Sequence, residues 1–498
     1  MSLAATNFLA PQQEVLSPLP LQLSAEAQSA DITVLDDPQG DEHLYVMNCG
    51  IITEWGVFDY PSLKSEIRFD ADGQTVYFHN LFPRYKECWV KGTIEGTEIV
   101  IPSGQAIYND AQYGEVYFYA SRAGEDGVFN TIDDMRLTLS TDEQGQKHIA
   151  SADTTVLGGV VKMDDDGAGY LVLNGYYEME EFLDPIVELP AGLATEQYVI
   201  TYQDYYWMTF SKAVEVAFDG DDVYLQGLIP DADETSGWVK GHIEGDYLCV
   251  PSRQGAYSGT YLLSFFAGYA ADYDDYGDPV FGSQDTLKLQ ISADRKDISS
   301  VEGDYALTVY GNRQRLIYAI EQIHMFAYDG DKPAVPATPT LNAVDQAFVE
   351  FNMPLCDVDG NYINPNLYTW SAFIDGELMT FDPDEYICLW EPMSEFEYSF
   401  TDHYDFMAYG DTHMFFIYDL LFEVLEIQTY YTVDGVRNAS EKARYGLTPD
   451  GLMALGEDVN VQRVEYFDLQ GRPLAARQGI CVARMTLSNG TVKTYKLH

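Results

Sequence analysis

The chain has 498 residues, a length typical of three or four domains, and 46% of them are hydrophobic, so each domain can bury an ordinary core. Its 80 acidic residues against 27 basic ones give a formal net charge of −53. This charge argues against nucleic acid as a partner and against an anionic membrane surface, because phosphate binding needs clustered lysine and arginine.

The first 41 residues contain Pro11, Pro18 and Pro20 and predict an N-terminal arm that ends as an edge strand. The chain opens with MSLAATNFLAPQQ, which lacks the basic start and the apolar run of a signal peptide. No stretch reaches the roughly eighteen apolar residues of a membrane helix. We therefore expect a soluble chain, or the mature form of an exported protein whose leader has been removed.

A motif follows that occurs twice. WVKGTIEG at Trp89–Gly96 returns as WVKGHIEG at Trp238–Gly245, with an offset of 149 residues. The segments PSGQ and PSRQ follow at the same offset, and VYFHNLFP and VYLQGLIP precede the two copies. A fixed long period is the signature of a duplicated structural unit. The sequence therefore predicts one repeat over residues 42–189 and a second over 190–330.

Each repeat shows the alternation of strands with one buried face. SEIRF places Ile67 and Phe69 on one side, and VEVAF does the same with Val214 and Val216. Further segments of the two repeats match in the same way. In the first repeat they are EVYFYA, MRLTLS and GYLVLNG, and in the second they are YLLSFF, LKLQIS and DYALTVYG. About eight short strands per repeat, joined by Gly, Asp and Asn turns, predict a closed antiparallel calycin-like barrel or a two-sheet sandwich. We prefer the barrel, because consecutive hairpins need no crossover.

The second half of the chain predicts two smaller β-domains. Residues 331–339 hold three regularly spaced prolines and predict a stiff spacer. Residues 340–446 contain six or seven strand patterns, a number that fits an immunoglobulin-like or fibronectin-like sandwich. A connector over 447–460 leads to a tail over 461–498, which is basic and predicts three to four strands. The fold class is therefore all-β throughout.

The tail resembles the C-terminal sorting domain of proteins exported by the type IX (Por) secretion system of Bacteroidota. Matching positions are Val464, Tyr466, Asp468, Gly471, Arg472, Gly479, Ile480, Arg484, Gly490 and Lys496. The chain departs from the pattern at Cys481, where an aromatic residue is usual, and ends in Leu-His. The repeats and the third domain are also similar to multidomain surface or secreted proteins of these bacteria. The resemblance implies an exported, Gram-negative surface or secreted protein and a tail that contacts the export machinery. It implies no catalytic residue.

The repeated motif supplies the candidate ligand-binding residues. Each tryptophan could be a stacking platform for a sugar, with the neighbouring lysine and the glutamine of the PSxQ segment as hydrogen-bond partners. The alternative is that tryptophan fills one end of the barrel and glutamine satisfies backbone groups in an irregular turn, because duplicated motifs usually encode fold. The candidates are Trp89, Lys91, Gln105, Trp238, Lys240 and Gln254.

Candidate metal ligands lie in the turn DVDGN, where Asp357, Asp359 and Asn361 alternate as in half a calcium loop. Weak Ca²⁺ binding is one interpretation and a solvated turn is the other; no other cofactor is predicted. A second set over TDHYDF…GDTH could hold a metal or an acid/base pair, or form the polar face of a hairpin; its members are His403, Asp405, Asp411 and His413. The six cysteines form no zinc pattern and are predicted to be free, with one or two disulfides as the alternative.

The chain carries no GxSxG, HExxH, P-loop or strand-linked GxGxxG motif. The leading hypothesis is therefore a non-enzymatic surface or secreted protein that binds or adheres to a glycan or to a host or diet polymer. One alternative is a hydrolase with a site between the two repeats. The other is a structural spacer of the cell envelope.

Overall fold

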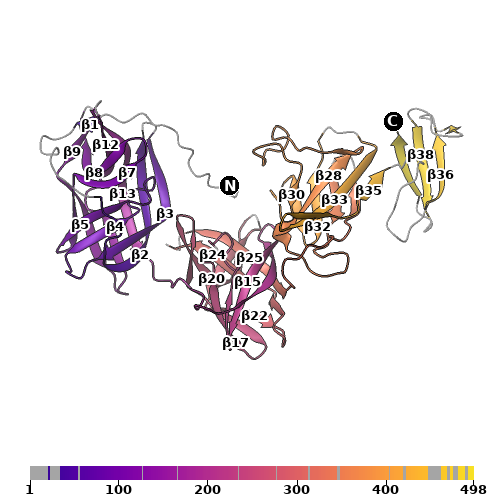
Figure 1. Ribbon diagram of the computed structural model, residues 1–498, viewed down its shortest axis with the longest axis horizontal. Coiled ribbons are helices and arrows are strands. Elements are labelled where there is room, and N and C mark those ends of the chain that lie inside the picture. The colour runs from indigo at the N-terminus through magenta and orange to yellow at the C-terminus, as the bar shows by residue number, and fades with distance from the viewer. Residues whose placement is uncertain are drawn as a thin grey trace.

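The computed structural model describes residues 21–22 and 34–497, apart from gaps at 54–55, 126, 165–166, 234, 276, 312–314, 345–347, 403, 419–421, 447–460, 468–471, 475–480 and 488–491. Strands dominate the described residues, and the one helical element recorded is the short 3-10 helix η1. The predicted all-β fold class is confirmed. Figure 1 shows the β-bodies following one another along the chain, coloured from indigo to yellow.

The first repeat closes into an antiparallel ring of strands, which we call barrel 1. The order is β2-β3-β4-β5-β6-β10-β11-β13, and β13 pairs back with β2. The bounds are β2 (Asp41–Thr53), β3 (Gly56–Phe69), β4 (Thr75–His79), β5 (Trp89–Glu95), β6 (Glu98–Pro102), β10 (Asp134–Thr141), β11 (Lys147–Ser151) and β13 (Gly167–Glu181). Side chains alternate between the inside and the outside of this ring. In β10, Met135 and Leu137 are buried, while Arg136 between them is exposed.

Four more strands of this repeat form a side sheet that grows out of the barrel. They are β7 (Gln105–Asp110), β8 (Gly114–Ala123), β9 (Phe129–Ile132) and β12 (Val156–Asp164). β8 pairs with the other three, and β12 pairs with the first half of β13. The register of β13 shifts between Gly175 and Glu178, where Tyr176 has a φ of 55°. Such a bulge bends a strand, so β13 can serve the side sheet with one half and the barrel with the other.

The second repeat builds barrel 2 with the same strand pairing, strand for strand. Its ring is β14-β15-β16-β17-β18-β22-β23-β25, closed by β25 on β14, and β19, β20, β21 and β24 form its side sheet. The bulge of β13 recurs in β25 at Gln322, with a φ of 50°. The bounds are β14 (Thr195–Asp204), β15 (Thr209–Asp219), β16 (Asp222–Leu225), β17 (Val239–Glu244), β18 (Tyr247–Pro251), β19 (Gln254–Ser258), β20 (Tyr261–Tyr273), β21 (Pro279–Gln284), β22 (Thr286–Ile291), β23 (Asp297–Ser300), β24 (Asp304–Tyr310) and β25 (Leu316–Ala327).

The predicted barrel is confirmed, but the predicted strand number is too low, because the side sheet adds strands to each ring. One predicted match is also wrong. GYLVLNG lies in β13, whose counterpart is β25, whereas DYALTVY is β24, the counterpart of β12. The two segments look alike because both alternate, and a period of two does not distinguish one strand of a barrel from the next.

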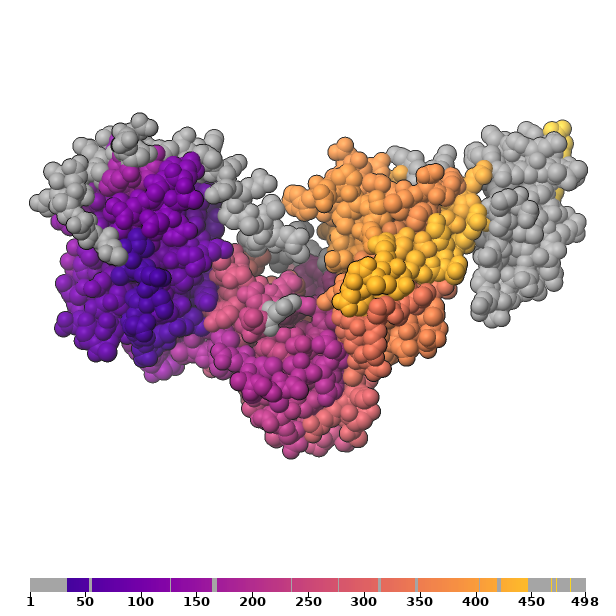
Figure 2. Space-filling view, in the orientation of Figure 1, coloured from indigo at the N-terminus to yellow at the C-terminus, as the bar shows by residue number. Residues whose placement is uncertain are grey.

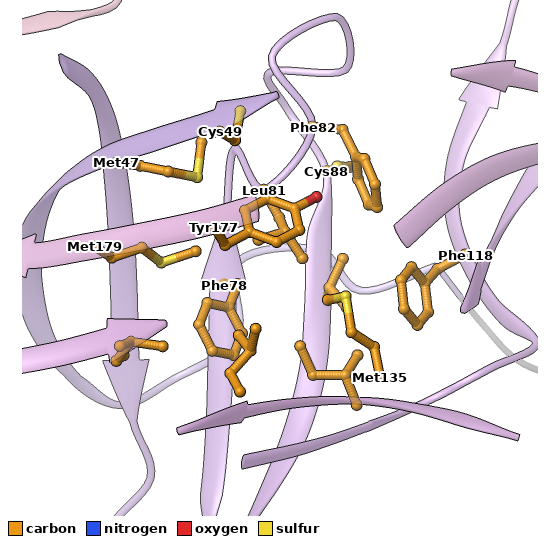
Figure 3. Close-up of a cluster of buried hydrophobic side chains, with 14 of the residues drawn as sticks. Met47, Cys49, Phe78, Leu81, Phe82, Cys88, Phe118, Met135, Tyr177 and Met179 are labelled. Atoms are coloured by element: carbon orange, nitrogen blue, oxygen red, sulfur yellow. The ribbon is translucent and has the colours of Figure 1, made fainter. Parts of the chain in front are cut away.

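Side chains that point inward form one apolar cluster in each barrel. Figure 3 shows the cluster of barrel 1, where Phe78, Phe118 and Tyr177 lie among methionines and two thiols. The thiols belong to Cys49 and Cys88, and burial raises the pKa of each to about 12. The five cysteines whose side chains are described are free, as predicted; the side chain of Cys481 is outside the described part.

The two barrels meet along β3 and β20. The amide of Lys64 donates to the carbonyl of Thr260 at 2.6 Å, and Tyr261 packs against both cores. The segment that joins the repeats continues this contact. A Cβ added to Gly255 would lie 2.6 Å from the ring of Phe182, and one added to Gly311 would lie 2.9 Å from it. These two positions therefore leave no room for a side chain.

Residues 340–446 fold as two sheets, which we call domain 3. One sheet is β26-β27-β32-β31, and the other is β29-β28-β33-β34 with β30 on β28 and β35 on β33. The bounds are β26 (Thr340–Val344), β27 (Phe348–Asn352), η1 (Pro365–Leu367), β28 (Tyr368–Ile374), β29 (Glu377–Leu378), β30 (Phe396–Glu397), β31 (Phe406–Tyr409), β32 (Thr412–Phe416), β33 (Val424–Val433), β34 (Val436–Ala439) and β35 (Ala443–Gly446). The immunoglobulin-like strand order stays a prediction.

Domain 3 is docked on barrel 2, contrary to the predicted stiff spacer. Its core cluster includes Val199 and Phe326 of barrel 2. The proline-rich segment lies along domain 3, where the amide of Val358 donates to the carbonyl of Val335 at 3.0 Å. The prolines therefore shape a packed segment rather than an extended linker. In Figure 2 barrel 2 lies between barrel 1 and domain 3.

The ends of the chain add two smaller pieces. In the N-terminal arm, β1 (Leu21–Gln22) pairs in parallel with β9 as an edge strand. The tail forms a four-stranded sheet in the order β37-β36-β38-β39. Its bounds are β36 (Val461–Phe467), β37 (Pro473–Leu474), β38 (Cys481–Leu487) and β39 (Val492–Leu497). The connector over 447–460 lies outside the described residues.

Candidate functional site

The two tryptophans of the repeated motif are buried. Trp89 is 6% exposed and Trp238 is 5% exposed. The ring of Trp89 stacks on His79 with 4.4 Å between centroids, and the Arg68 guanidinium lies 4.6 Å from it. Trp238 packs beneath the segment between the repeats, where Val187 pairs with it. Neither ring offers a free face for a sugar.

The lysines of the motif lie on the outer face of each barrel. Lys91 is exposed, opposite Tyr77 of β4. The ammonium of Lys240 pairs with Asp222 at 2.7 Å, and this hydrogen bond raises the pKa of Lys240. The lysine stems can thus cover the neighbouring strand while the charge stays in solvent.

The glutamines hold a corner of each barrel together. Oε1 of Gln105 accepts from the amide of Lys91 at 2.9 Å, and Nε2 donates to the carbonyls of Lys91 and Pro102 at 2.9 Å and 2.8 Å. Gln254 repeats every bond with Lys240 and Pro251, at 2.7 Å, 3.0 Å and 2.7 Å. The side chain replaces a strand partner at the point where the chain turns from the ring into the side sheet.

The serine of the PSxQ segment completes this corner. Ser103 donates through its hydroxyl to the carbonyl of Ile132 at 2.6 Å and accepts from the amide of Ala120 at 2.8 Å. Ser252 makes the same two bonds, at 2.5 Å and 2.8 Å. The glutamine, the serine and the backbone of the motif lysine therefore form one hydrogen-bonded corner per barrel.

The acidic turn of domain 3 satisfies itself. Oδ1 of Asp357 accepts from the amides of Asp359 and Asn361, each at 2.9 Å, and the Asn361 side-chain amide donates to Oδ2 at 3.1 Å. Partial burial opposes ionisation, but the bonds from Asn361 prevail and lower the pKa of Asp357. Asn361 therefore presents nitrogen to the carboxylate, whereas a Ca²⁺ site needs it to present oxygen.

The histidine and aspartate set of domain 3 does not form a single site. His413 is 2% exposed, and its ring nitrogens lie 3.0 Å and 2.7 Å from the carbonyl oxygens of Asp411 and Tyr398. Burial lowers the pKa of His413, although these carbonyls oppose the shift. Asp405 instead accepts from the hydroxyl of Tyr418, and His403 lies outside the described residues. In the described part of the chain, no group of three or more His, Cys, Asp or Glu could hold a metal ion.

At the junction of the repeats, where the hydrolase alternative would have its site, two contacts join the barrels. Leu63 pairs with Tyr261, and the ammonium of Lys64 lies 4.1 Å from the ring of Tyr257.

Exposed aromatic residues gather instead at the turn between β14 and β15. Trp207 is 63% exposed and Tyr206 is 37% exposed. The rings of Tyr205 and Tyr206 lie 4.0 Å apart, and their hydroxyls are 2.5 Å apart. The sequence signal is the run DYYWM, which occurs in one repeat only and so is not marked by the duplication.

This turn is held rigidly. Oδ1 of Asp204 accepts from the amides of Tyr206 and Met208 at 3.0 Å and 2.9 Å. Nε2 of Gln203 donates to the carbonyl of Trp207 at 2.8 Å. These bonds fix Trp207 at a φ of 66°, a conformation that is rare for a bulky residue.

The hairpin of β20 and β21 in the same barrel carries two more exposed rings. Tyr273 is 63% exposed, and Tyr269, at 43%, lies across Gly282, where a Cβ would be 2.7 Å from the ring. Burial, the Tyr206 hydroxyl and the carboxylates of Asp204 and Asp278 raise the pKa of Tyr205, so the field of this hairpin acts on the turn. We call the set the aromatic end of barrel 2; its members are Tyr205, Tyr206, Trp207, Tyr269 and Tyr273.

Polar groups lie beside these rings. Nε2 of Gln322 donates to Oε1 of Gln203 at 2.7 Å. Burial and the carboxylate of Glu321 raise the pKa of Tyr305 to about 12, and Tyr273 contributes to the shift. Flat rings with amides, carboxylates and hydroxyls around them can pack on the C–H face of a sugar and bond its hydroxyls.

No protein-family model matches the chain, and no curated protein matches it in sequence. Among solved structures, a variant of transferrin-binding protein B from Haemophilus parasuis matches 58% of this chain and 77% of its own length, at 11% identity and a TM-score of 0.14. A likeness of that size supports no inference, so the fold rests on the strand pairing described above. The described part of the chain contains no helix long and apolar enough to cross a membrane.

Proposed function

We propose that this chain is a non-enzymatic surface or secreted binding protein whose aromatic end of barrel 2 binds a glycan. The observation that carries the proposal is Trp207, a bulky ring that is 63% exposed and is fixed by hydrogen bonds in a strained turn. Rigid aromatic side chains give large contact areas at a small entropic cost. The net charge of −53 repels acidic polymers, so neutral polysaccharides are the expected ligands.

Trp207→Ala should weaken glycan binding at least about tenfold, because exposed tryptophans at binding surfaces are frequent hot spots. The measurement is a glycan array followed by titration of the bound polysaccharide. The matched control is Trp390→Ala, which removes a tryptophan of domain 3 that is 76% exposed, and which should bind the glycan as the parent does. An array on which the parent binds no glycan, or binding that survives Trp207→Ala unchanged, contradicts the proposal.

We also propose that the C-terminal tail directs export through a type IX system, as its resemblance implies. Its basic composition, unlike that of the rest of the chain, supports a separate role, and the four-stranded sheet is a unit of its own. A reporter fused to residues 461–498 should reach the surface or medium of a host that has this system. Retention in a mutant of that host without the system is the control, and retention of the fusion in both strains contradicts the proposal.

A further inference from the structure

The described parts of three loops contact one another in domain 3; residues 403 and 419–421 are not among them. The loops connect β29 to β30, β30 to β31, and β32 to β33. The ring of Tyr386 in the first loop lies 5.3 Å from that of Tyr418 in the third. Tyr418 donates to Asp405 in the second loop, and the Asp402 carboxylate of the second loop hydrogen-bonds Cys388 in the first. Loops clustered at one end of a sandwich form a continuous surface.

The first loop is anchored by buried side chains, and other apolar side chains of the same loop are exposed to solvent. Tyr386 is buried and donates to the carbonyl of Phe416 at 2.9 Å, and Leu389 is 6% exposed. Phe381 and Met393 exchange backbone hydrogen bonds of 2.8 Å and 3.0 Å and close the neck of the loop. Between and beyond these anchors, Ile387 is 91% exposed and Trp390 is 76% exposed.

The second loop is held in the same way. Oδ1 of Asp402 accepts from the amides of Tyr404, Asp405 and Phe406, at 3.0, 2.8 and 2.8 Å. This leaves the ring of Tyr404 69% exposed. Large apolar side chains held in water by ordered loops mark an interaction site, and they lose little entropy on binding because their loops are already ordered. We call Ile387, Trp390, Tyr404 and Tyr418 the loop patch.

The charge around the loop patch selects the partner. No lysine or arginine occurs between Lys332 and Arg437, whereas acids recur through the span. Arg437 itself is paired with Glu395 at 2.9 Å. The patch is therefore a set of aromatic and aliphatic side chains among carboxylates. Lysine and arginine can lie over such rings and pair with such carboxylates, whereas an acidic partner is repelled.

We propose that the loop patch docks a basic polypeptide segment, one whose lysine or arginine side chains alternate with apolar ones. This site is independent of the glycan surface of barrel 2. It gives the chain a second, protein-directed contact.

The test uses the full chain and a phage-displayed library of random dodecapeptides. The variant is the triple change Ile387→Ser, Trp390→Ser and Tyr404→Ser, which keeps every carboxylate. A triple change of exposed apolar residues outside both proposed surfaces, Phe58→Ser, Leu183→Ser and Tyr247→Ser, is the control. Thermal unfolding of both should match the parent, because all six side chains are exposed.

We expect enrichment of peptides with net positive charge and at least one large apolar residue. They should bind the parent and the control equally and the loop-patch variant at least about tenfold more weakly, and their affinity should fall with added salt. If no enriched peptide distinguishes the variant from the parent, the acids alone attract the peptides and the proposal is wrong. Discrimination by neutral or acidic peptides would also overturn it.

Discussion

Gln254→Met should lower the free energy of unfolding of barrel 2 by about 3 kcal/mol. Methionine has a similar volume but cannot make the three bonds that Gln254 makes to Lys240 and Pro251. The side chain is 4% exposed, so the freed backbone groups cannot all be met by water. Thermal unfolding should show the loss, and amide hydrogen exchange should locate it in β17 and β19.

Two further substitutions test whether the loss of stability in Gln254→Met comes from the corner. Gln290→Met changes an exposed glutamine of β22 and should leave stability within about 0.5 kcal/mol of the parent. Gln105→Met should cost as much in barrel 1 as Gln254→Met costs in barrel 2, because the bonds are the same. A stable Gln254→Met protein with parental exchange would remove the structural role of the corner.

Trp238→Ala should cost about 4 kcal/mol, within the range for truncating a buried aromatic ring. The ring is 5% exposed and packs with Ala217 and Tyr224 under the segment between the repeats. Truncation should therefore also release that segment, and amide exchange over residues 187–193 should rise. Thermal unfolding and hydrogen exchange of the full chain measure the two effects.

The control for this change is Trp207→Ala, which removes the same side chain from an exposed turn and should alter stability by less than about 0.5 kcal/mol. Parental stability of Trp238→Ala, with residues 187–193 still protected, would mean that the motif is not structural.

Repetition was the strongest signal in the sequence, and it predicted the architecture correctly. A duplicated motif with alternating strands on both sides predicts a duplicated barrel. The sequence offered two roles for the glutamine, ligand binding and the satisfaction of backbone groups in a turn, and Gln105 has backbone partners. Which groups it bonds could not be derived, because the Lys91 backbone is 14 residues away and such a contact leaves no local pattern.

The packing between domains could not be predicted either. Three regularly spaced prolines among small residues predict a spacer, because that prediction takes only the local stiffness of the chain into account. In the structure Val335 bonds the backbone of domain 3, and Val199 of β14 joins the core of that domain. A strand with alternating polar and apolar residues can have one face covered or both faces covered. Which of the two holds for β14 depends on a domain that lies far away in the sequence, so the alternation of β14 alone does not decide it.

One measurement decides whether the glycan binds at the repeated motif or at the turn between β14 and β15. It is the affinity of the identified polysaccharide for Trp207→Ala and for Trp238→Ala, at a temperature where both variants are folded. We expect Trp207→Ala to bind at least about tenfold more weakly than the parent while unfolding at the parental temperature. We expect Trp238→Ala to bind nearly as the parent does while unfolding at a lower temperature. Lost binding in Trp238→Ala at parental stability, with full binding in Trp207→Ala, would place the ligand at the repeated motif and contradict the assignment made here.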